Sequence, residues 1–581
     1  MSYYPTLPVQ NSTRKMLDVF GGYNHNLRIG DGEFFDMKNL TSDYYPVLSP
    51  RAPRGVYAMP NSPQGLIAKD SLCYVDGTDF VMNEYHVDMN LSTDADDCPK
   101  QLISMGAYVV IMPDRKYINT LDLTDYGDLD ASFTTSADVT FELCSIEGES
   151  YSNATVSQSE PSEPKNMDLW IDTSSTPHTL KRFSETNEMW VSIATTYIKI
   201  SSVGIGKAFA QYDGVTISGI NAESLQDLNA STVLWGRGDD YLIVTGILDE
   251  VTTQLYADGA ITVERKMPKV DFLTESGNRL WGCRYGVANN GEVVNEIYAC
   301  KLGDFKNWNC FMGLSTDSYA ATCGTDGQFT GAITHLGYPL FFKETCVHKI
   351  YGSYPANYQI QTTACRGVQK GSERSLAIVN EILYYKARHA VCAYDGSLPT
   401  EISSAFGDAR YQNAVAGAHG NKYYISMQDM SGGCHLFVFD TAKRMWHRED
   451  DLRADAFCSC RDTLYCISRG KILTLNTGNA EKVEWMAQTG EIGITSPDMK
   501  YISNLTLRMM LERCSIVRFY VQYDFDENWE YLFELHGTSL RSFSIPIRPH
   551  RCDHLKLRME GIGDAKIYSI TKTIVKGSDL S

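Results

Sequence analysis

The sequence predicts an all-β fold: a six- or seven-bladed β-propeller with an inserted small β-domain and a C-terminal β-sandwich. Three observations lead to this prediction. Short runs of β-branched and aromatic residues, including many of the 35 tyrosines, alternate with Gly, Asn and Asp turns along the chain. A turn residue, an apolar residue and an aromatic residue recur in this order about every 40 residues, the length of a four-stranded propeller blade. The last part of the chain alternates apolar and polar residues, as strands with one buried face do.

The N-terminal part of the chain is expected to supply the first blades. We predict that residues 1–60 form an extended segment that joins the propeller and that residues 61–138 form its first part. The repeat occurs twice there, at Tyr74 in SLCYVDG and at Tyr108 in GAYVVIM. Each occurrence is followed by a second apolar run, which indicates a β-hairpin.

The long step from Tyr108 to the next occurrence of the repeat predicts an inserted β-domain, which we place at residues 139–267. It begins with a Ser/Glu/Pro stretch typical of an exposed linker and continues with a short hairpin in which Trp170 and Trp190 flank a turn. These two tryptophans are candidate glycan-contact residues, because exposed aromatic rings commonly stack on sugars. The alternative is that the two rings pack across a small hairpin core.

Residues 268–484 are predicted to form the second part of the propeller. The repeat recurs there at Trp281, Phe341, Tyr384, Tyr424 and Tyr465. A four-stranded sheet cannot bury both of its faces alone, and stacking blades around an axis covers those faces and leaves only short edges. A set of β-sandwiches with similar hairpins is the alternative arrangement.

The C-terminal residues 485–581 are predicted to form the β-sandwich, because runs such as 502–511 alternate apolar and polar residues. Basic residues gather in this region against the overall charge of the chain. We take Arg541, Arg548 and Arg551 as candidate contacts to an acidic partner. An ordinary surface of mixed charge is the alternative.

The chain is acidic, since 52 Lys and Arg against 71 Asp and Glu give a formal net charge of −19 and a pI near 5.1. This balance argues against a protein that coats DNA or binds anionic membranes, because both need a basic surface. It is compatible with a protein that lines a path for DNA without holding it. No signal-peptide pattern opens the chain, and its apolar runs are too short for a transmembrane helix, so we expect no membrane insertion.

The sequence also lacks the common catalytic and metal-binding motifs. There is no GxSxG, HExxH, P-loop or CxxC, and nothing singles out two of the many acids as the paired carboxylates of a glycosidase. The 16 cysteines are expected to be buried free thiols of a protein made in a reducing cytoplasm. We therefore expect no enzyme, with no catalytic residues, no cofactor and no metal. A polysaccharide-cleaving propeller is the alternative.

The N-terminal segment is the most distinctive part of the sequence. It contains Phe20-Gly21-Gly22-Tyr23-Asn24, then Gly32-Glu33-Phe34, Met37-Lys38-Asn39-Leu40, Arg51 and Arg54-Gly55. This segment resembles the opening of tailed-bacteriophage proteins of the packaged-DNA stabilisation or tail hub (nozzle) family, where it precedes a β-propeller. The run NEIYACKLGDFKNW resembles blades of those proteins, and residues 161–190 resemble a module of phage tail and baseplate proteins.

The resemblance implies a structural role in the virion. It implies a non-enzymatic tail hub or nozzle on the head–tail axis, which forms a homo-oligomeric ring, expected to be a hexamer, around the DNA channel and helps to retain packaged DNA until ejection. The implied partners are portal or adaptor proteins, tail fibre or tail tip proteins, and genomic DNA in passage. The implied location is the virion tail, after synthesis in the host cytoplasm. The alternative function is a receptor- or glycan-binding tail or baseplate protein.

Overall fold

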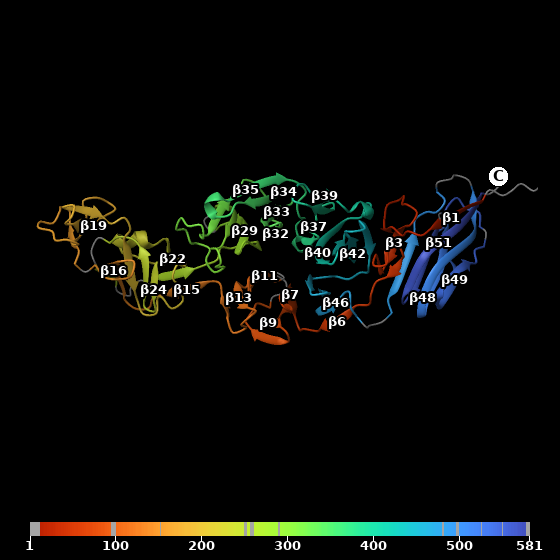
Figure 1. Ribbon diagram of the computed structural model, residues 1–581, viewed down its shortest axis with the longest axis horizontal. Helices are drawn as coiled ribbons and strands as arrows, with labels where there is room; N and C mark the ends of the chain where they lie inside the picture. The colour runs from red at the N-terminus through yellow and green to blue at the C-terminus, as the bar shows by residue number, and fades with distance from the viewer. Residues whose placement is uncertain are drawn as a thin grey trace, which may run out of the picture. The chain divides into compact units, whose positions relative to one another are not determined.

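The computed structural model of the chain is all-β (Figure 1). It describes residues 12–93, 100–151, 153–248, 252–255, 261–288, 291–478, 482–494, 499–524, 526–548 and 550–576. Within these ranges the helices are four short 3₁₀ turns: η1 (Glu223–Leu228), η2 (Pro355–Asn357), η3 (Glu373–Ser375) and η4 (Ser404–Phe406). None of them is long and apolar enough to cross a membrane.

Seven four-stranded sheets follow one another along the chain, as blades do. The first two are β7 (Pro63–Ala68), β8 (Leu72–Asp76), β9 (Asp79–Met82) and β10 (Tyr85–Asp88), then β11 (Gln101–Met105), β12 (Tyr108–Met112), β13 (Lys116–Asn119) and β14 (Tyr126–Asp128). The next two are β28 (Phe272–Ser276), β29 (Arg279–Val287), β30 (Val293–Ala299) and β31 (Tyr319–Thr322), then β32 (Gly331–His335), β33 (Tyr338–Lys343), β34 (Cys346–Tyr351) and β35 (Gln359–Ala364).

The last three sheets complete the series. Two of them are β36 (Ala377–Val379), β37 (Ile382–Lys386), β38 (Val391–Tyr394) and β39 (Thr400–Glu401), then β40 (Tyr411–His419), β41 (Lys422–Asp429), β42 (Cys434–Asp440) and β43 (Met445–Arg448). The seventh is β44 (Ala456–Cys460), β45 (Thr463–Ser468), β46 (Lys471–Thr474) and β6 (Gly55–Ala58). All seven aromatic residues of the sequence repeat lie on the second strand of a sheet.

The seventh sheet is closed by a strand from the other end of the propeller sequence. The strand β6 precedes the first blade, yet it pairs antiparallel with β46, with Val56 opposite Leu473. This exchange of a strand between the first and last blades is typical of propellers that close on themselves. The predicted all-β propeller is confirmed, and the number of blade-like sheets is seven.

The chain divides into two compact units. One unit comprises residues 1–100, 342–347 and 363–581, and the other comprises residues 101–341 and 348–362. The first unit includes the sheets β7–β10, β36–β39, β40–β43 and β44–β46 with β6, together with the C-terminal sheet. The second unit includes the sheets β11–β14 and β28–β31 and the inserted domain.

The inserted domain is a small β-sandwich with an attached hairpin sheet. One layer contains β15 (Ala131–Thr134), β27 (Thr262–Arg265), β22 (Gly214–Ser218) and β23 (Ser231–Val233). The other contains β24 (Gly236–Gly238), β25 (Tyr241–Thr245), β21 (Tyr197–Ser201), β16 (Val139–Cys144) and β26 (Thr252–Leu255). The hairpin sheet is β17 (Thr155–Ser157), β18 (Leu169–Asp172), β19 (Thr179–Ser184) and β20 (Met189–Ser192). The domain begins earlier than residue 139, because β15 pairs with β27.

The C-terminal sheet folds over on itself. Its strands are β1 (Ser12–Leu17), β2 (Gly22–Tyr23), β3 (Glu33–Lys38), β47 (Glu484–Thr489), β48 (Lys500–Tyr523), β49 (Glu530–Ile545), β50 (Leu555–Ile562) and β51 (Ala565–Lys576). The first half of β48 pairs with β51 and the second half with β50, and the pairing with β49 slips between Leu511 and Ile516. Such irregularities bend strands, so β48 and β49 pass through both layers of the sandwich.

The N-terminal segment does not join the propeller alone. Residues 1–11 lie outside the described residues, β1 pairs with β51, and β3 pairs with β47. Only β4 (Leu40–Thr41), β5 (Ser49–Pro50) and β6 lie outside the C-terminal sheet, and of these β6 enters a blade. Figure 1 shows the red N-terminal strands β1 and β3 beside the blue strands β48 and β51.

The cysteines that the structure describes agree with the expectation of unpaired thiols. None of these 15 forms a disulfide with another described cysteine, and most are buried. Burial raises the pKa of the Cys300 and Cys458 thiols to about 12, so these groups stay protonated and unreactive at neutral pH.

Candidate functional site

The N-terminal segment that carries the family resemblance is packed against the blade β40–β43. Tyr23 is buried, and its ring lies 5.5 Å from that of Phe437 and 6.2 Å from that of Phe406. Gly22 has φ +84°, and a side chain there would clash with the carbonyl oxygen of Trp446. The position therefore requires glycine for both its backbone conformation and its close approach to the blade.

A glutamate closes the loop that follows this contact. The Glu33 carboxylate accepts hydrogen bonds from the Asn24 side chain at 2.9 Å and from the Gly30 backbone at 2.6 Å. Backbone bonds from Asn24 to the Phe34 carbonyl and from His25 to the Ala405 carbonyl fix both sides of the loop. Residues 24–34 are therefore held between the C-terminal sheet and the turn at η4.

Two arginines attach the end of the segment to the same blade. Arg54 donates to Glu449 at 2.7 Å and to Asp450, and Arg51 lies 3.4 Å from Asp450 and donates to Asn39 at 2.9 Å. Burial alone would raise the pKa of Asp450, but the two guanidinium groups outweigh it and hold that pKa below its usual value. The four charges form a shielded network, which we call the arginine clasp.

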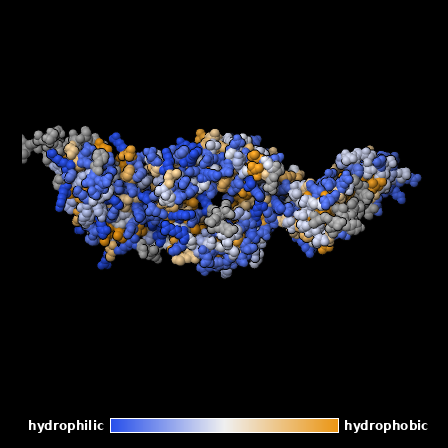
Figure 2. Space-filling view, turned by 180° about the vertical axis from the view of Figure 1, so that it is seen from behind, coloured by the Kyte–Doolittle hydropathy of each residue, from blue (hydrophilic) through white to orange (hydrophobic). Residues whose placement is uncertain are grey.

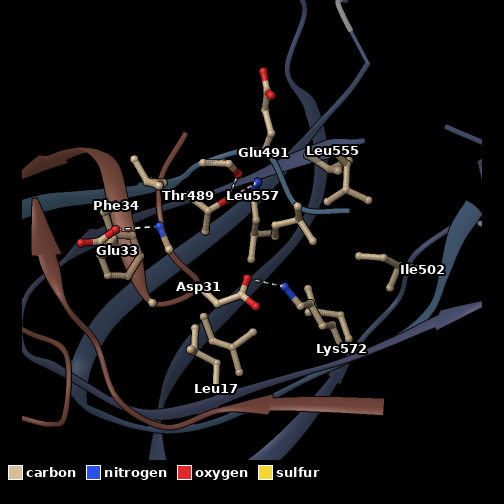
Figure 3. A pocket seen from close by; sticks show the side chains of 18 of the residues that line it. Leu17, Asp31, Glu33, Phe34, Thr489, Glu491, Ile502, Leu555, Leu557 and Lys572 are labelled. Carbon is tan, nitrogen blue, oxygen red and sulfur yellow. Dashed lines mark hydrogen bonds and ion pairs between the residues drawn. The ribbon is translucent and has the colours of Figure 1, made fainter. Parts of the chain in front are cut away.

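A cavity lies between the two layers of the C-terminal sheet (Figure 3). Its free volume is about 50 Å³, and most of its wall is apolar. Leu17 and Ile502 line it from one layer, and Leu555 and Leu557 from the other. A cavity of this size is much smaller than the usual small-ligand pocket, so it suits at most an apolar side chain.

Charged groups lie at one side of this cavity. Lys572 donates to Asp31 at 3.0 Å, and Lys15 also pairs with Asp31. Burial would raise the pKa of Asp31, but the two lysines hold it below its usual value. Figure 3 shows the side chains of Asp31 and Lys572 pointing toward each other. Since these charges are paired, the free surface that the cavity offers is mainly apolar.

A cleft of about 590 Å³, which we call the polar cleft because polar and charged side chains make up about half of its wall, lies among the blade strands β7, β40, β41 and β44. Its wall carries the side-chain amides of Asn413 and Gln428, which are joined by a hydrogen bond of 2.9 Å. Arg453 lies 3.4 Å from Asp455 in the same wall. Amides and paired charges of this kind suit a polar, uncharged ligand better than an apolar one.

Trp170 and Trp190 do not form an exposed sugar platform. Trp170 is 3% exposed, its indole nitrogen donates to the Ser157 carbonyl, and Lys181 lies 4.6 Å from its ring centre. Trp190 packs edge-on against it at 5.4 Å and also against Phe183. Trp170 is therefore a core residue of the hairpin sheet, which fits the alternative that the two rings pack across a small hairpin core, and the glycan-contact role of the half-buried Trp190 stays a prediction.

The predicted partner-contact arginines are all exposed. Arg541 lies on β49, opposite Met509 and 4.7 Å from the ring of Phe543. Arg548 and Arg551 lie in the connection between β49 and β50. Their exposure allows contact with a partner, and the role itself stays a prediction.

Sequence reasoning missed the arginine clasp and a basic cavity around Lys386. The acidic half of the clasp lies about 400 residues from its arginines, and no local signal joins the two halves. Part of the basic cavity could have been noticed in the sequence, because Lys386, Arg388 and His389 lie within four residues of one another.

The chain matches no known protein-family model and no curated protein. Solved structures with some likeness include an exo-β-1,3-galactanase from Phanerochaete chrysosporium (7% identity, 52% of this chain, 94% of that chain, TM-score 0.21). They also include a glycoside hydrolase family 43 arabinoxylan arabinofuranohydrolase from Bacillus subtilis (7%, 52%, 94%, TM-score 0.19) and a Trypanosoma rangeli sialidase (8%, 90%, 96%, TM-score 0.17).

These comparisons correct one expectation. The missing catalytic motifs led to the prediction that the chain is not an enzyme, but the matched structures include glycoside hydrolases and a sialidase. Such enzymes need no short sequence motif, since their acids come from distant parts of the chain. The lack of a motif therefore does not exclude an enzyme, and TM-scores this low assign no activity to this one.

Proposed function

We propose that this chain is a structural protein of a bacteriophage tail, a hub or nozzle that forms a ring around the DNA channel and helps to retain packaged DNA until ejection. The observation that carries the proposal is the N-terminal segment. Gly22, Tyr23 and Arg54, which belong to the motif that carries the resemblance, each make a specific contact with the blade β40–β43 or with the residues directly after it. These contacts give three residues of the motif a role in attaching the segment to the blade, and this role supports the resemblance.

The charge and the surface also support this role. A net charge of −19 disfavours tight binding of phosphates, which suits a wall past which DNA must slide. On the face shown in Figure 2, hydrophobic side chains are scattered among hydrophilic ones. The proposed partners are the portal or adaptor, tail fibre or tail tip proteins, and further copies of the chain.

Two measurements test the proposal. The purified chain, alone or with its neighbouring tail proteins, should form a closed ring, expected to be a hexamer with six times the 65.0 kDa of one chain, which native mass spectrometry resolves. Electron microscopy of the particle should then place the chain on the head–tail axis. A position in a side fibre would overturn the proposal.

The polar cleft favours a second candidate, a receptor- or glycan-binding tail protein. Its amides and paired charges suit the hydroxyl groups of a glycan. A glycan array should then show binding that Asn413→Ala weakens while Trp190→Ala leaves it unchanged. Binding that depends on Trp190 instead would contradict the assignment to the cleft.

A further inference from the structure

A basic cavity lies in the blade β36–β39, next to the start of β40. Its free volume is about 50 Å³, and it opens to solvent. Four basic side chains line it: Lys386, Arg388, His389 and Arg410. The only carboxylate among its lining residues is Glu401. This composition is unexpected in a chain with a net charge of −19.

The floor of the cavity holds a buried lysine. Lys386 ends β37, is 3% exposed, and donates to the Gln369 side chain at 3.0 Å and to the Ala387 carbonyl. Burial and the charge of Arg410 lower the pKa of Lys386 to about 8, so most of it is still protonated at pH 7. Its hydrogen-bond donors are largely occupied, so it would act on a ligand mainly through its charge.

The rim of the cavity carries the free donors. Arg388 and Arg410 are exposed, and within the described part of the chain neither forms an ion pair. The Glu401 charge is already balanced, because its carboxylate lies 2.8 Å from Arg366. Asp408 is close in sequence but does not line the cavity. The site therefore combines an excess of positive charge with two guanidinium groups that have no acidic partner.

From this arrangement we infer a binding site for a phosphoryl group. Arginine offers a planar pair of donors that matches two phosphate oxygens, and a protonated lysine below them adds charge in a partly desolvated cavity. Because Arg388 and Arg410 are exposed, their guanidinium groups are open to a phosphoryl group that approaches from solvent, whereas the small cavity below them does not admit a folded macromolecule. This inference does not depend on the proposed tail function.

Isothermal titration calorimetry of the whole chain tests the site with two probes, inorganic phosphate and a nucleoside 5′-monophosphate. We expect saturable binding of phosphate, which Arg388→Gln and Arg410→Gln each weaken by about tenfold or more, the usual effect of losing a charge-assisted hydrogen bond. Arg14→Gln removes an exposed arginine on β1 and should leave the affinity unchanged.

The two probes separate the sources of the phosphate. Tighter binding of the monophosphate would show that the natural ligand extends beyond the phosphoryl group, and equal binding would show that phosphate alone fills the site. Absence of heat at 10 mM of either probe would overturn the inference. So would equal weakening by all three arginine variants, because that result would reflect the charge of the whole chain and no site. All three positions are exposed, so the variants should fold.

Discussion

Lowering the pH from 7 to 5 should loosen the blade β40–β43 through one buried histidine. His447 lies on β43 and is 4% exposed. Burial, helped by the charge of Lys422, lowers the pKa of His447 from 6.5 to about 4. The imidazole is therefore neutral in the folded chain at pH 5, whereas in the unfolded chain most of it carries a proton.

This difference between the folded and the unfolded chain sets the sign and the size of the change in stability with pH. Because the unfolded state binds the proton more tightly, the stabilising contribution is complete above pH 6.5 and is lost as the pH falls toward 4. The two pKa values give a loss of about 2 kcal/mol between pH 7 and pH 5, and about 3 kcal/mol below pH 4. Burial also lowers the pKa of His419 on β40 of the same blade, so the comparison with a His447→Gln chain is needed to assign the change to His447.

Hydrogen–deuterium exchange measures the effect in the blade itself. After correction for intrinsic exchange rates, amides of β42 and β43 should lose about 30-fold in protection between pH 7 and pH 5. The His447→Gln chain should lose far less over the same range, whatever its stability at pH 7. His86→Gln, at an exposed imidazole, should behave as the unaltered chain does. An equal loss of protection in the unaltered and His447→Gln chains would refute the reasoning.

Three further substitutions test the packing. Gly22→Ala should destabilise the chain by about 1–3 kcal/mol or more, because φ +84° and the Trp446 carbonyl both exclude a side chain; a thermal midpoint equal to that of the unaltered chain would contradict this. Arg54→Ala should lower the free energy of urea unfolding by about 3–5 kcal/mol, because it leaves Glu449 shielded from water and poorly paired. Arg518→Ala, at an exposed ion pair, should lower it by less than about 1 kcal/mol. Similar losses for the two variants would show that the arginine clasp is not shielded. Trp170→Ala should destabilise the inserted domain by about 3–5 kcal/mol, more than Trp190→Ala does. A larger loss of stability for Trp190→Ala would contradict the buried position of Trp170 on which this prediction rests.

The blades could be predicted from the sequence because their signal is local and repeated. Each aromatic anchor, from Tyr74 to Tyr465, lies on the second strand of its sheet, where the apolar run on either side makes a buried strand. The same reasoning placed the start of the C-terminal region within one residue, since β47 begins at Glu484. Patterns within about ten residues are therefore sufficient to locate strands.

The pairing of strands that lie far apart in the sequence could not be predicted from local patterns. Phe34 lies opposite Thr489, and Arg54 reaches Glu449, and nothing in either segment specifies its partner. The exposure of Trp170 depends on Ser157 and Lys181, which approach it only in the folded hairpin. The basic cavity needs Arg410 to return beside Lys386 through the turn at η4, so only half of it is visible in the sequence.

The course of the N-terminal segment makes two parts of one unit depend on each other. The segment gives β1, β2 and β3 to the C-terminal sheet and β6 to the seventh blade, and between them Arg51 and Arg54 bind the blade β40–β43. Separation of the C-terminal sheet from these blades would expose Tyr23 and break the clasp, so their unfolding should be coupled.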